Sequence, residues 1–323
     1  MSKNIWLEGM MGLVIGDALG MPVQFCSREA LKKRPITGMR GYGSYKMPAG
    51  TWSDDSSMAL VTLDSLQEKK SVHLEDIMQK FVLWLYNGEY TPYGEAFDEG
   101  NTCVYAISKF KREGDVATCG KTGEYANGNG ALMRIMPMCL YAFEAEKAGR
   151  VSLEEAVAGV HQVTALTHNH LRAKIASGIY YFMIKALLET EGSLKEKLQT
   201  GIMQARDFYV RDADNHGELA KYERLFHPEE FEATPEERIS SSGYVVHSLE
   251  AAVWSLLTTN CFEEALLKAV NLGDDADTVG AIAGGLAALY YGYESIPKEW
   301  LEVIVKRDWI EMLCNRSAEC FRS

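Results

Sequence analysis

Apolar residues recur at helical spacing along most of this chain, and this pattern constrains the fold more than any other feature of the sequence. The series start at Ile77, Leu153, Leu171, Val246 and Val279, and each continues in steps of three or four residues. Such a repeat gives a helix one apolar face, whereas a half-buried strand alternates every second residue. Alternating stretches are scarce, so the sequence predicts an all-α fold.

The length and composition suit a single compact domain. Of 323 residues, 47% are apolar, which is enough to fill a substantial core. Because no internal repeat or low-complexity tract divides the chain, we expect one multi-helix domain over residues 1–323. The polar interval at about residues 206–242 is the one candidate insertion, either a mobile lid or an ordinary surface excursion.

The charge and the cysteine content limit which classes of partner and which cellular compartment we expect for this protein. The 33 basic and 45 acidic side chains leave a net charge of −12 with no basic stripe, so we expect no nucleic-acid partner. Apolar runs end well before the roughly 20 residues that a membrane span needs, so we expect no membrane partner. Seven cysteines without a CxxC pair, and no recognisable secretion signal, fit the cytoplasm.

Two acidic clusters stand at the starts of predicted helices. One is "NLGDDADTVGAIAGG" from Asn271 to Gly285, and the other is "GTWSDDSSMAL" from Gly50 to Leu60. Helix capping explains either cluster alone, but like charges about 4 Å apart repel by about 4 kcal/mol at a dielectric of about 20. Together the clusters favour an all-oxygen site for Mg²⁺ or Mn²⁺. Its candidate ligands are Ser53, Asp54, Asp55, Asp275, Asp277 and Thr278.

Small residues follow the second cluster. Gly280, Ala281 and Gly284 would let a neighbouring helix backbone approach closely, so we expect a central, buried helix there.

Three further motifs are candidates for ligand contacts. "NGNGALMR", Asn127 to Arg134, is either a phosphate-binding loop or an ordinary Asn-Gly turn. "THNH" contains His168, which is either structural or a ligand contact. "GDALG" places Asp17 between glycines, a pattern that is explained by a tight turn with Asp17 as its capping acid.

The motifs "GDALG", "TWSDDSS", "NGNGALMR", "LTHNH" and "GDDADTVGAIAGG", in this order from about Gly12 to Gly292, resemble the ADP-ribosylglycohydrolase family. The resemblance implies a compact all-α domain with two Mg²⁺ or Mn²⁺ ions in a cleft. It also implies removal of ADP-ribose from a modified protein side chain or a small conjugate.

The same resemblance implies roles for individual residues. Ser53, Asp54 and Asp55 match one half of the metal site, and Asp275, Asp277 and Thr278 match the other, with Asp274 outside the pattern. The residues that match the phosphate loop are Asn127, Gly128, Asn129, Gly130 and Ala131. His168 matches a histidine near the ligand. Asp98 in "FDEGN" matches an acid that reaches the substrate, and Tyr244 in "SGYVV" matches a residue beside the scissile bond.

One position departs from the family. Many members have Glu-Phe after "GDALG", with the glutamate active in catalysis, whereas this chain has Gln24-Phe25. An amide is no general base. Without a glutamate at this position, general-base catalysis would come from Asp98, from a metal-bound hydroxide, or from a metal-ligating aspartate such as Asp55 or Asp275. The alternatives to this glycosidic-bond hydrolase are an inactive ADP-ribose-binding or structural relative and a two-metal phosphoesterase, and the acceptor is open.

Overall fold

The computed structural model describes residues 3–321 and is helical throughout. Within these residues there are isolated β-bridges but no strands. The all-α prediction is therefore confirmed. The α-helices are α1 (Ile5–Gly20), α2 (Arg28–Lys33), α3 (Asp54–Lys69), α4 (Leu74–Asn87), α5 (Asn101–Glu113), α6 (Met136–Lys147), α7 (Leu153–Ala165), α8 (Leu171–Glu189), α9 (Leu194–Tyr209), α10 (His216–Leu219), α11 (Pro228–Glu232), α12 (Val245–Leu257), α13 (Phe262–Asn271), α14 (Ala276–Tyr291), α15 (Lys298–Val303) and α16 (Arg307–Phe321).

Short 3-10 helices complete the chain, and several flank the site described below. They lie at Met21–Val23, Glu124–Ala126, Leu132–Arg134, Ala213–Asn215, Ala220–Phe226, Glu236–Arg238 and Tyr293–Ser295. The five apolar series predicted from the sequence fall on α4, α7, α8, α12 and α14. None of the helices in the described part of the chain is long and apolar enough to cross a membrane.

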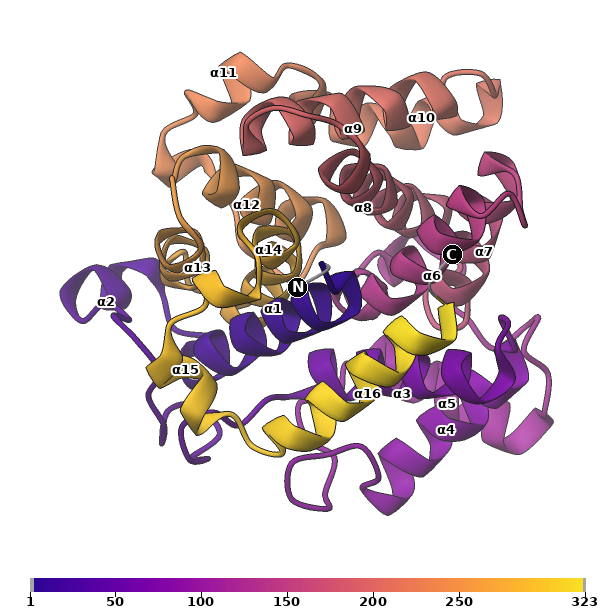
Figure 1. Ribbon diagram of the computed structural model, residues 1–323, viewed down its shortest axis with the longest axis horizontal. Coiled ribbons are helices and arrows are strands. Elements are labelled where there is room, and N and C mark those ends of the chain that lie inside the picture. The colour runs from indigo at the N-terminus through magenta and orange to yellow at the C-terminus, as the bar shows by residue number, and fades with distance from the viewer. Residues whose placement is uncertain (1–2, 322–323) are drawn as a thin grey trace.

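Two central helices, α1 and α14, touch backbone to backbone (Figure 1). A Cβ atom placed on Gly12 would lie 2.2 Å from the carbonyl oxygen of Gly284, and one on Gly16 would lie 1.9 Å from that of Gly280. No side chain fits at these distances, so glycine is required on both helices. The expected central helix with a close neighbour is confirmed, and that neighbour is α1.

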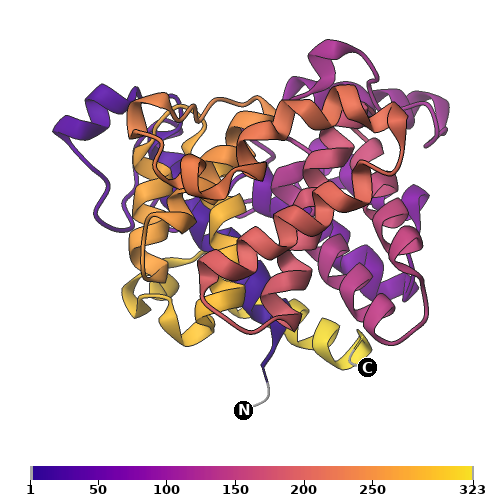
Figure 2. The ribbon, with the colours of Figure 1, turned by 90° about the horizontal axis from the view of Figure 1, so that it is seen from above.

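The remaining helices surround this pair. α12 and α13 pack on α14, while α3, α6 and α16 pack on α1. In Figures 1 and 2, α9, α10 and α11 cover one outer face of the molecule. The polar interval 206–242 lies there as short helical turns, and it packs inward through Tyr222, Leu225 and Phe231, which are buried.

The glycine contact predicts a large stability loss on a minimal substitution. Gly16→Ala should lower the free energy of unfolding by about 2 kcal/mol or more, because its methyl group overlaps the Gly280 backbone, which cannot rotate away. Gly217→Ala in α10 is the matched control, because a Cβ there meets nothing within 4 Å. This alanine should raise the free energy of unfolding by at most about 1 kcal/mol. Urea unfolding of both variants measures this. Equal stability of the two variants would contradict the close contact.

Candidate active site

The end of α1 meets the start of α14, and α3 begins beside them. Asp17, in the last turn of α1, accepts hydrogen bonds from the backbone N–H of Ser53 at 2.9 and 3.0 Å. It also accepts from the N–H of Ser56 at 3.1 Å and from the Ser56 hydroxyl at 2.5 Å. Asp17 therefore caps α3 from a different helix rather than capping a turn of its own.

Helix capping does not explain the two acidic clusters. Ser53 and Asp275 occupy the N-cap positions of α3 and α14, yet neither side chain makes a capping hydrogen bond. Asp54 and Asp55 in the first turn of α3 and Asp277 in the first turn of α14 are buried instead of pointing to solvent. These side chains are thus available for another partner.

The carboxylates converge into a group that we call the acidic pole: Asp17, Asp54, Asp55, Asp98, Asp275 and Asp277. Within it, oxygen atoms of Asp17, Asp55 and Asp277 all lie within 4.8 Å of one another. Burial, and next the nearby charge of Asp98, hold the pKa of Asp54 and Asp277 well above their usual range, while burial followed by the Asp17 charge does so for Asp55. In the described chain, no lysine, arginine or histidine forms an ion pair with any member of the pole.

The acidic pole fits divalent cations. Buried oxygens of Asp55 (Oδ1), Asp98 (Oδ2) and Asp277 (Oδ2) have no hydrogen-bond partner, although buried polar atoms are normally paired. Carboxylate and hydroxyl oxygens are the ligands that hard cations such as Mg²⁺ and Mn²⁺ take. The acidic cluster can therefore hold metal ions.

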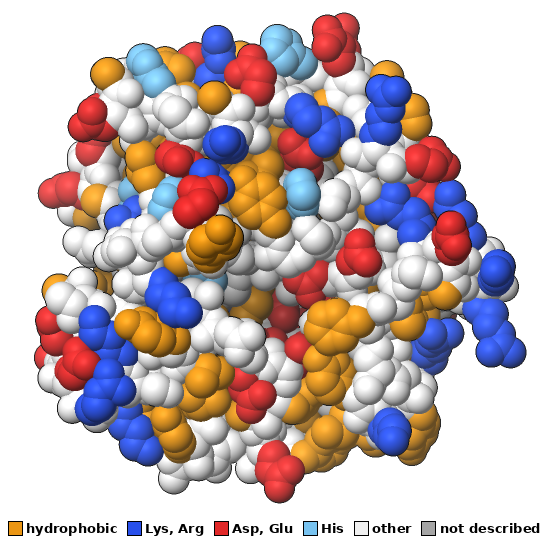
Figure 3. All heavy atoms as spheres, turned by 180° about the vertical axis from the view of Figure 1, so that it is seen from behind, with side chains coloured by type: hydrophobic (Ala, Val, Ile, Leu, Met, Phe, Trp, Pro, Cys, Tyr) orange, Lys and Arg blue, Asp and Glu red, His pale blue; other side chains and the backbone are white. Residues whose placement is uncertain are grey.

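A cavity of about 340 Å³ opens above the acidic pole. Figure 3 shows one face of the molecule hollowed near its centre, with acidic side chains inside the hollow. The predicted site residues that line the cavity are Gln24, Asp54, Asp55, Asp98, Gly128, Asn129, Gly130, His168, Asp275 and Thr278. Those that do not line it are Ser53, Asp277, Asn127, Ala131 and Tyr244, of which the first four are buried beside it.

The loop from Asn127 to Ala131 is tied to both sides of the cavity. An isolated bridge pairs Gly128 with Tyr244, with hydrogen bonds of 3.0 Å from Asn129 N–H to Gly243 and from Val245 N–H to Asn127. The Asn129 side chain donates to Asp275 Oδ2 at 2.6 Å. The loop therefore connects Asp275 of the acidic pole to Tyr244, and it continues into a 3-10 turn before α6 begins.

His168 is buried behind the loop. Its Nδ1 lies 2.8 Å from the Thr167 hydroxyl, and a Cβ on Gly130 would lie 3.0 Å from its ring. Burial, together with the charges of Arg134 and Lys121, lowers the pKa of His168 to about 3. The imidazole is consequently neutral at physiological pH.

Gln24 and Asp98 both line the cavity. The Gln24 amide donates from Nε2 to Asp275 Oδ1 at 3.2 Å. Asp98 has a left-handed backbone with φ of 63°, and its Oδ1 accepts the hydroxyl of Tyr45. Burial raises the pKa of Asp98 to about 6, and the Tyr45 hydrogen bond opposes that rise.

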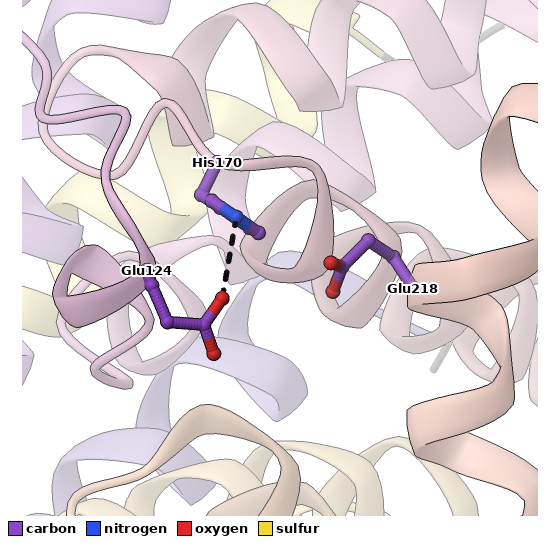
Figure 4. Close-up of side chains that lie close together, drawn as sticks. All are labelled: Glu124, His170 and Glu218. Carbon is purple, nitrogen blue, oxygen red and sulfur yellow. Dashed lines mark ion pairs between the residues drawn. The ribbon is translucent and has the colours of Figure 1, made fainter.

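A second group of ligand-type side chains, Glu124, His170 and Glu218, lies outside this cavity (Figure 4). Arg172 already pairs with both glutamates, at 2.7 Å to each. His170 Nδ1 accepts the Arg172 N–H at 3.2 Å, so in the neutral ring Nε2 carries the proton and faces Glu124 at 3.9 Å. We interpret the group as an ion-pair cluster that joins α10 to the turn before the Asn127 loop.

Sequence reasoning missed Asp17 as a member of the acidic pole, and it missed Arg172. The signal for Asp17 was present, because it is the one charged residue in the apolar run "MMGLVIGDALGM", and a charge buried in such a run needs polar partners. Arg172 gave no such signal, since its partners are distant in sequence.

Comparison with known proteins agrees with this geometry. The ADP-ribosylglycohydrolase family matches residues 4–323. ADP-ribosylarginine hydrolase Tri1 of Serratia proteamaculans is 31% identical over 95% of this chain and 77% of its own length. ADP-ribosyl-[dinitrogen reductase] glycohydrolase of Rhodospirillum rubrum is 31% identical over 91% of this chain and 88% of its own length. A solved ADP-ribosylglycohydrolase-related protein complex superposes with a TM-score of 0.78 at 29% identity, covering 98% of both chains. The chain therefore belongs to the ADP-ribosylglycohydrolase family, and by that membership it is a hydrolase of a bond between ADP-ribose and an acceptor.

Proposed function

We propose that this protein hydrolyses the glycosidic bond between ADP-ribose and an arginine side chain, with two Mg²⁺ or Mn²⁺ ions as cofactors. The observation that carries the proposal is the acidic pole beneath a cavity that the Asn127 loop borders. The arginine acceptor is supported by the relative named ADP-ribosylarginine hydrolase. ADP-ribosylated protein or a small conjugate would be the substrate.

The proposed cation ligands come from two helix starts: Ser53, Asp54, Asp55, Asp275, Asp277 and Thr278. Asp17 lies within the same oxygen cluster, and because three Ser53 and Ser56 donors occupy it, we assign it to holding α3 in place. When bound, two divalent cations would supply positive charge that orients the ribose hydroxyls and polarises the attacking water.

The loop residues Asn127 to Ala131 would hold the pyrophosphate of ADP-ribose, which places the distal ribose over the acidic pole. His168 lies directly behind Gly128 and Gly130, and as a neutral ring it adds hydrogen bonding without charge. Tyr244, bridged to Gly128, would border the scissile bond.

Asp98 is the proposed proton acceptor. Asp98 lines the cavity, its buried Oδ2 has no hydrogen-bond partner, and its pKa of about 6 lies close to the working pH of a cytoplasmic enzyme. Asp55 and Asp275 would act through the cations, and Gln24, as an amide, would act by holding Asp275. Seven free cysteines support the cytoplasm as the compartment.

Product analysis tests the reaction against its rivals. An ADP-ribosylarginine conjugate incubated with protein and Mg²⁺ or Mn²⁺ should give free ADP-ribose and unmodified arginine, read by mass spectrometry. AMP with ribose phosphate still attached to the arginine would instead identify a phosphoesterase. Unchanged substrate together with tight ADP-ribose binding would identify an inactive relative.

Metal removal should abolish both activity and a stabilising effect. Metal at about 100 times its dissociation constant should add about 2.7 kcal/mol to the free energy of unfolding, and a chelator should reverse this. Asp277→Asn should stay folded, lose hydrolysis and show little metal-dependent stabilisation, because the amide keeps the shape but not the charge. Exposed Asp274, next to the cluster but outside the ligand set, provides the control: Asp274→Asn should keep the full metal effect. Hydrolysis in excess chelator would refute the two-cation site.

Neutral His168 predicts a specific pH dependence. Its pKa is about 3 in the folded protein and about 6.5 when unfolded, so its stability contribution is present above pH 6.5 and is lost as pH falls toward 3. Between pH 7 and pH 5 the loss is about 2 kcal/mol. Between pH 7 and pH 5, the free energy of unfolding of His168→Gln should therefore fall by about 2 kcal/mol less than that of the wild type. Urea unfolding at both pH values measures this difference. An equal loss in the variant and the wild type would show that the pKa of His168 does not change on folding and would contradict the buried neutral ring.

A further inference from the structure

Arg134, which ends the 3-10 turn after the Asn127 loop, is a fully buried cation. Its Nη2 donates to the backbone oxygen of Val163 at 3.3 Å and to the Thr167 hydroxyl at 2.9 Å, whereas Nε and Nη1 have no hydrogen-bond partner. No carboxylate in the described chain forms an ion pair with it, and the Phe81 ring, 4.8 Å away, compensates its charge only in part. An anion bound near this guanidinium would offset the cost of burying it.

The Thr167 hydroxyl links Arg134 to His168. Its Oγ1 accepts the Arg134 N–H and lies 2.8 Å from His168 Nδ1. The other acceptor that this hydroxyl contacts is the Cys103 thiol, and sulfur is the weaker acceptor, so Thr167 donates to Nδ1. Donation from a cation polarises the hydroxyl and strengthens this second bond. A neutral imidazole whose Nδ1 accepts a hydrogen bond carries its own proton on Nε2.

The Nε2 atom of His168 lies against the glycines of the Asn127 loop. A Cβ placed on Gly128 or on Gly130 would lie 3.5 Å from Nε2, and these two glycines line the cavity together with His168. Nε2 has no hydrogen-bond partner in the described chain, and unlike Oδ1 of Asn127 it is not fully buried. Its N–H is therefore a donor that a ligand on the loop can use.

We propose that Arg134 and Thr167 are positioning residues for ADP-ribose, which hold His168 with its proton on Nε2 so that this N–H donates to a pyrophosphate oxygen at the Asn127 loop. A phosphate oxygen only accepts hydrogen bonds, so the opposite tautomer would turn a lone pair toward it. A neutral donor also leaves the carboxylates of the acidic pole free for cations. Arg134 and Thr167 act through His168 and touch no ligand themselves. The inference rests on the proposed function, which places the pyrophosphate on this loop.

Nitrogen NMR of the imidazole ring reads the tautomer directly. In protein labelled with ¹⁵N-histidine, the signal that disappears in His168→Gln identifies this residue. At pH 7 it should show a protonated Nε2 and an unprotonated Nδ1. A protonated Nδ1 would overturn the proposal.

Calorimetry with ADP-ribose and Mg²⁺ measures the effect on binding. Thr167→Val should raise the Kd by about 3- to 30-fold, because the ring loses the partner that orients it, whereas Thr167→Ser keeps the hydroxyl and should stay within about twofold. Thr164→Val is the matched control, since the Thr164 hydroxyl is equally buried but contacts Val160 and Ser177 instead of His168. Equal weakening in Thr164→Val, or none in Thr167→Val, would overturn the proposal.

A double-mutant cycle separates positioning from a general loss of structure. In a His168→Ala background, Thr167→Val should raise the Kd by less than about a further twofold, because the group through which it acts is gone. Arg134→Met should weaken binding in the wild-type background and not in the His168→Ala background. It removes a buried charge that has no acidic partner, so we expect it to fold, and urea unfolding verifies this. Additive losses in the cycle would overturn the proposal.

Hydrolysis is measured separately from binding. If the wild type binds ADP-ribose with the expected pattern of Kd values but hydrolyses no conjugate, the proposed function fails and the role of Arg134 and Thr167 is supported. If hydrolysis occurs and the cycle is additive, the positioning role fails alone. A wild type that does not bind ADP-ribose overturns the positioning role as well.

Discussion

The backbone contact between α1 and α14 determines where the functional groups of this protein lie. A Cβ on Gly20 would lie 2.4 Å from the Ala276 carbonyl oxygen, so the contact extends to the end of α1 and the beginning of α14. Asp17 and Asp277 are carried on those two ends, and their oxygens consequently fall within one 4.8 Å cluster. Any side chain between the helices would separate these carboxylates, which explains why charged and glycine-rich segments are neighbours in the sequence.

The electrostatics of the acidic pole combine helix ends with neutral donors. α3 and α14 both begin there, and the N-terminal ends of helices favour carboxylates. Asp17 lies at the unfavourable C-terminal end of α1, and the N–H groups of α3 compensate for this. Asp275 is held by two amides, from Gln24 and Asn129, rather than by a lysine or arginine. Amides fix its orientation without cancelling its charge, so the charge is available to a cation.

The sequence predicted the helices and the pairing of the acidic clusters, but not how the elements meet. Helices such as α8 and α12 carry an apolar repeat, which reports burial directly. The α1–α14 contact depends on glycines, which have no side chain to mark a face, and so the partner of α14 was not identified. The left-handed conformations of Phe25 and Asp98 were likewise unpredictable, because residue type alone would place glycine or asparagine there.

The amide at Gln24 has a physical consequence for the rest of the site. A carboxylate there would place two negatively charged groups at the 3.2 Å contact that Nε2 now makes with Asp275, whereas the amide makes an attractive hydrogen bond. The position thus holds an aspartate in place and loses the capacity to accept a proton. Asp98 is held differently, by the Tyr45 hydroxyl on a loop where Tyr45 also packs against Phe97 with ring centroids 5.4 Å apart. The charge of Asp98 also raises the pKa of Asp54 and Asp277, so Asp98 is next to the proposed cation ligands. We infer that proton transfer and cation binding share the acidic pole, and that Gln24 is compatible with catalysis because Asp98 can accept the proton there.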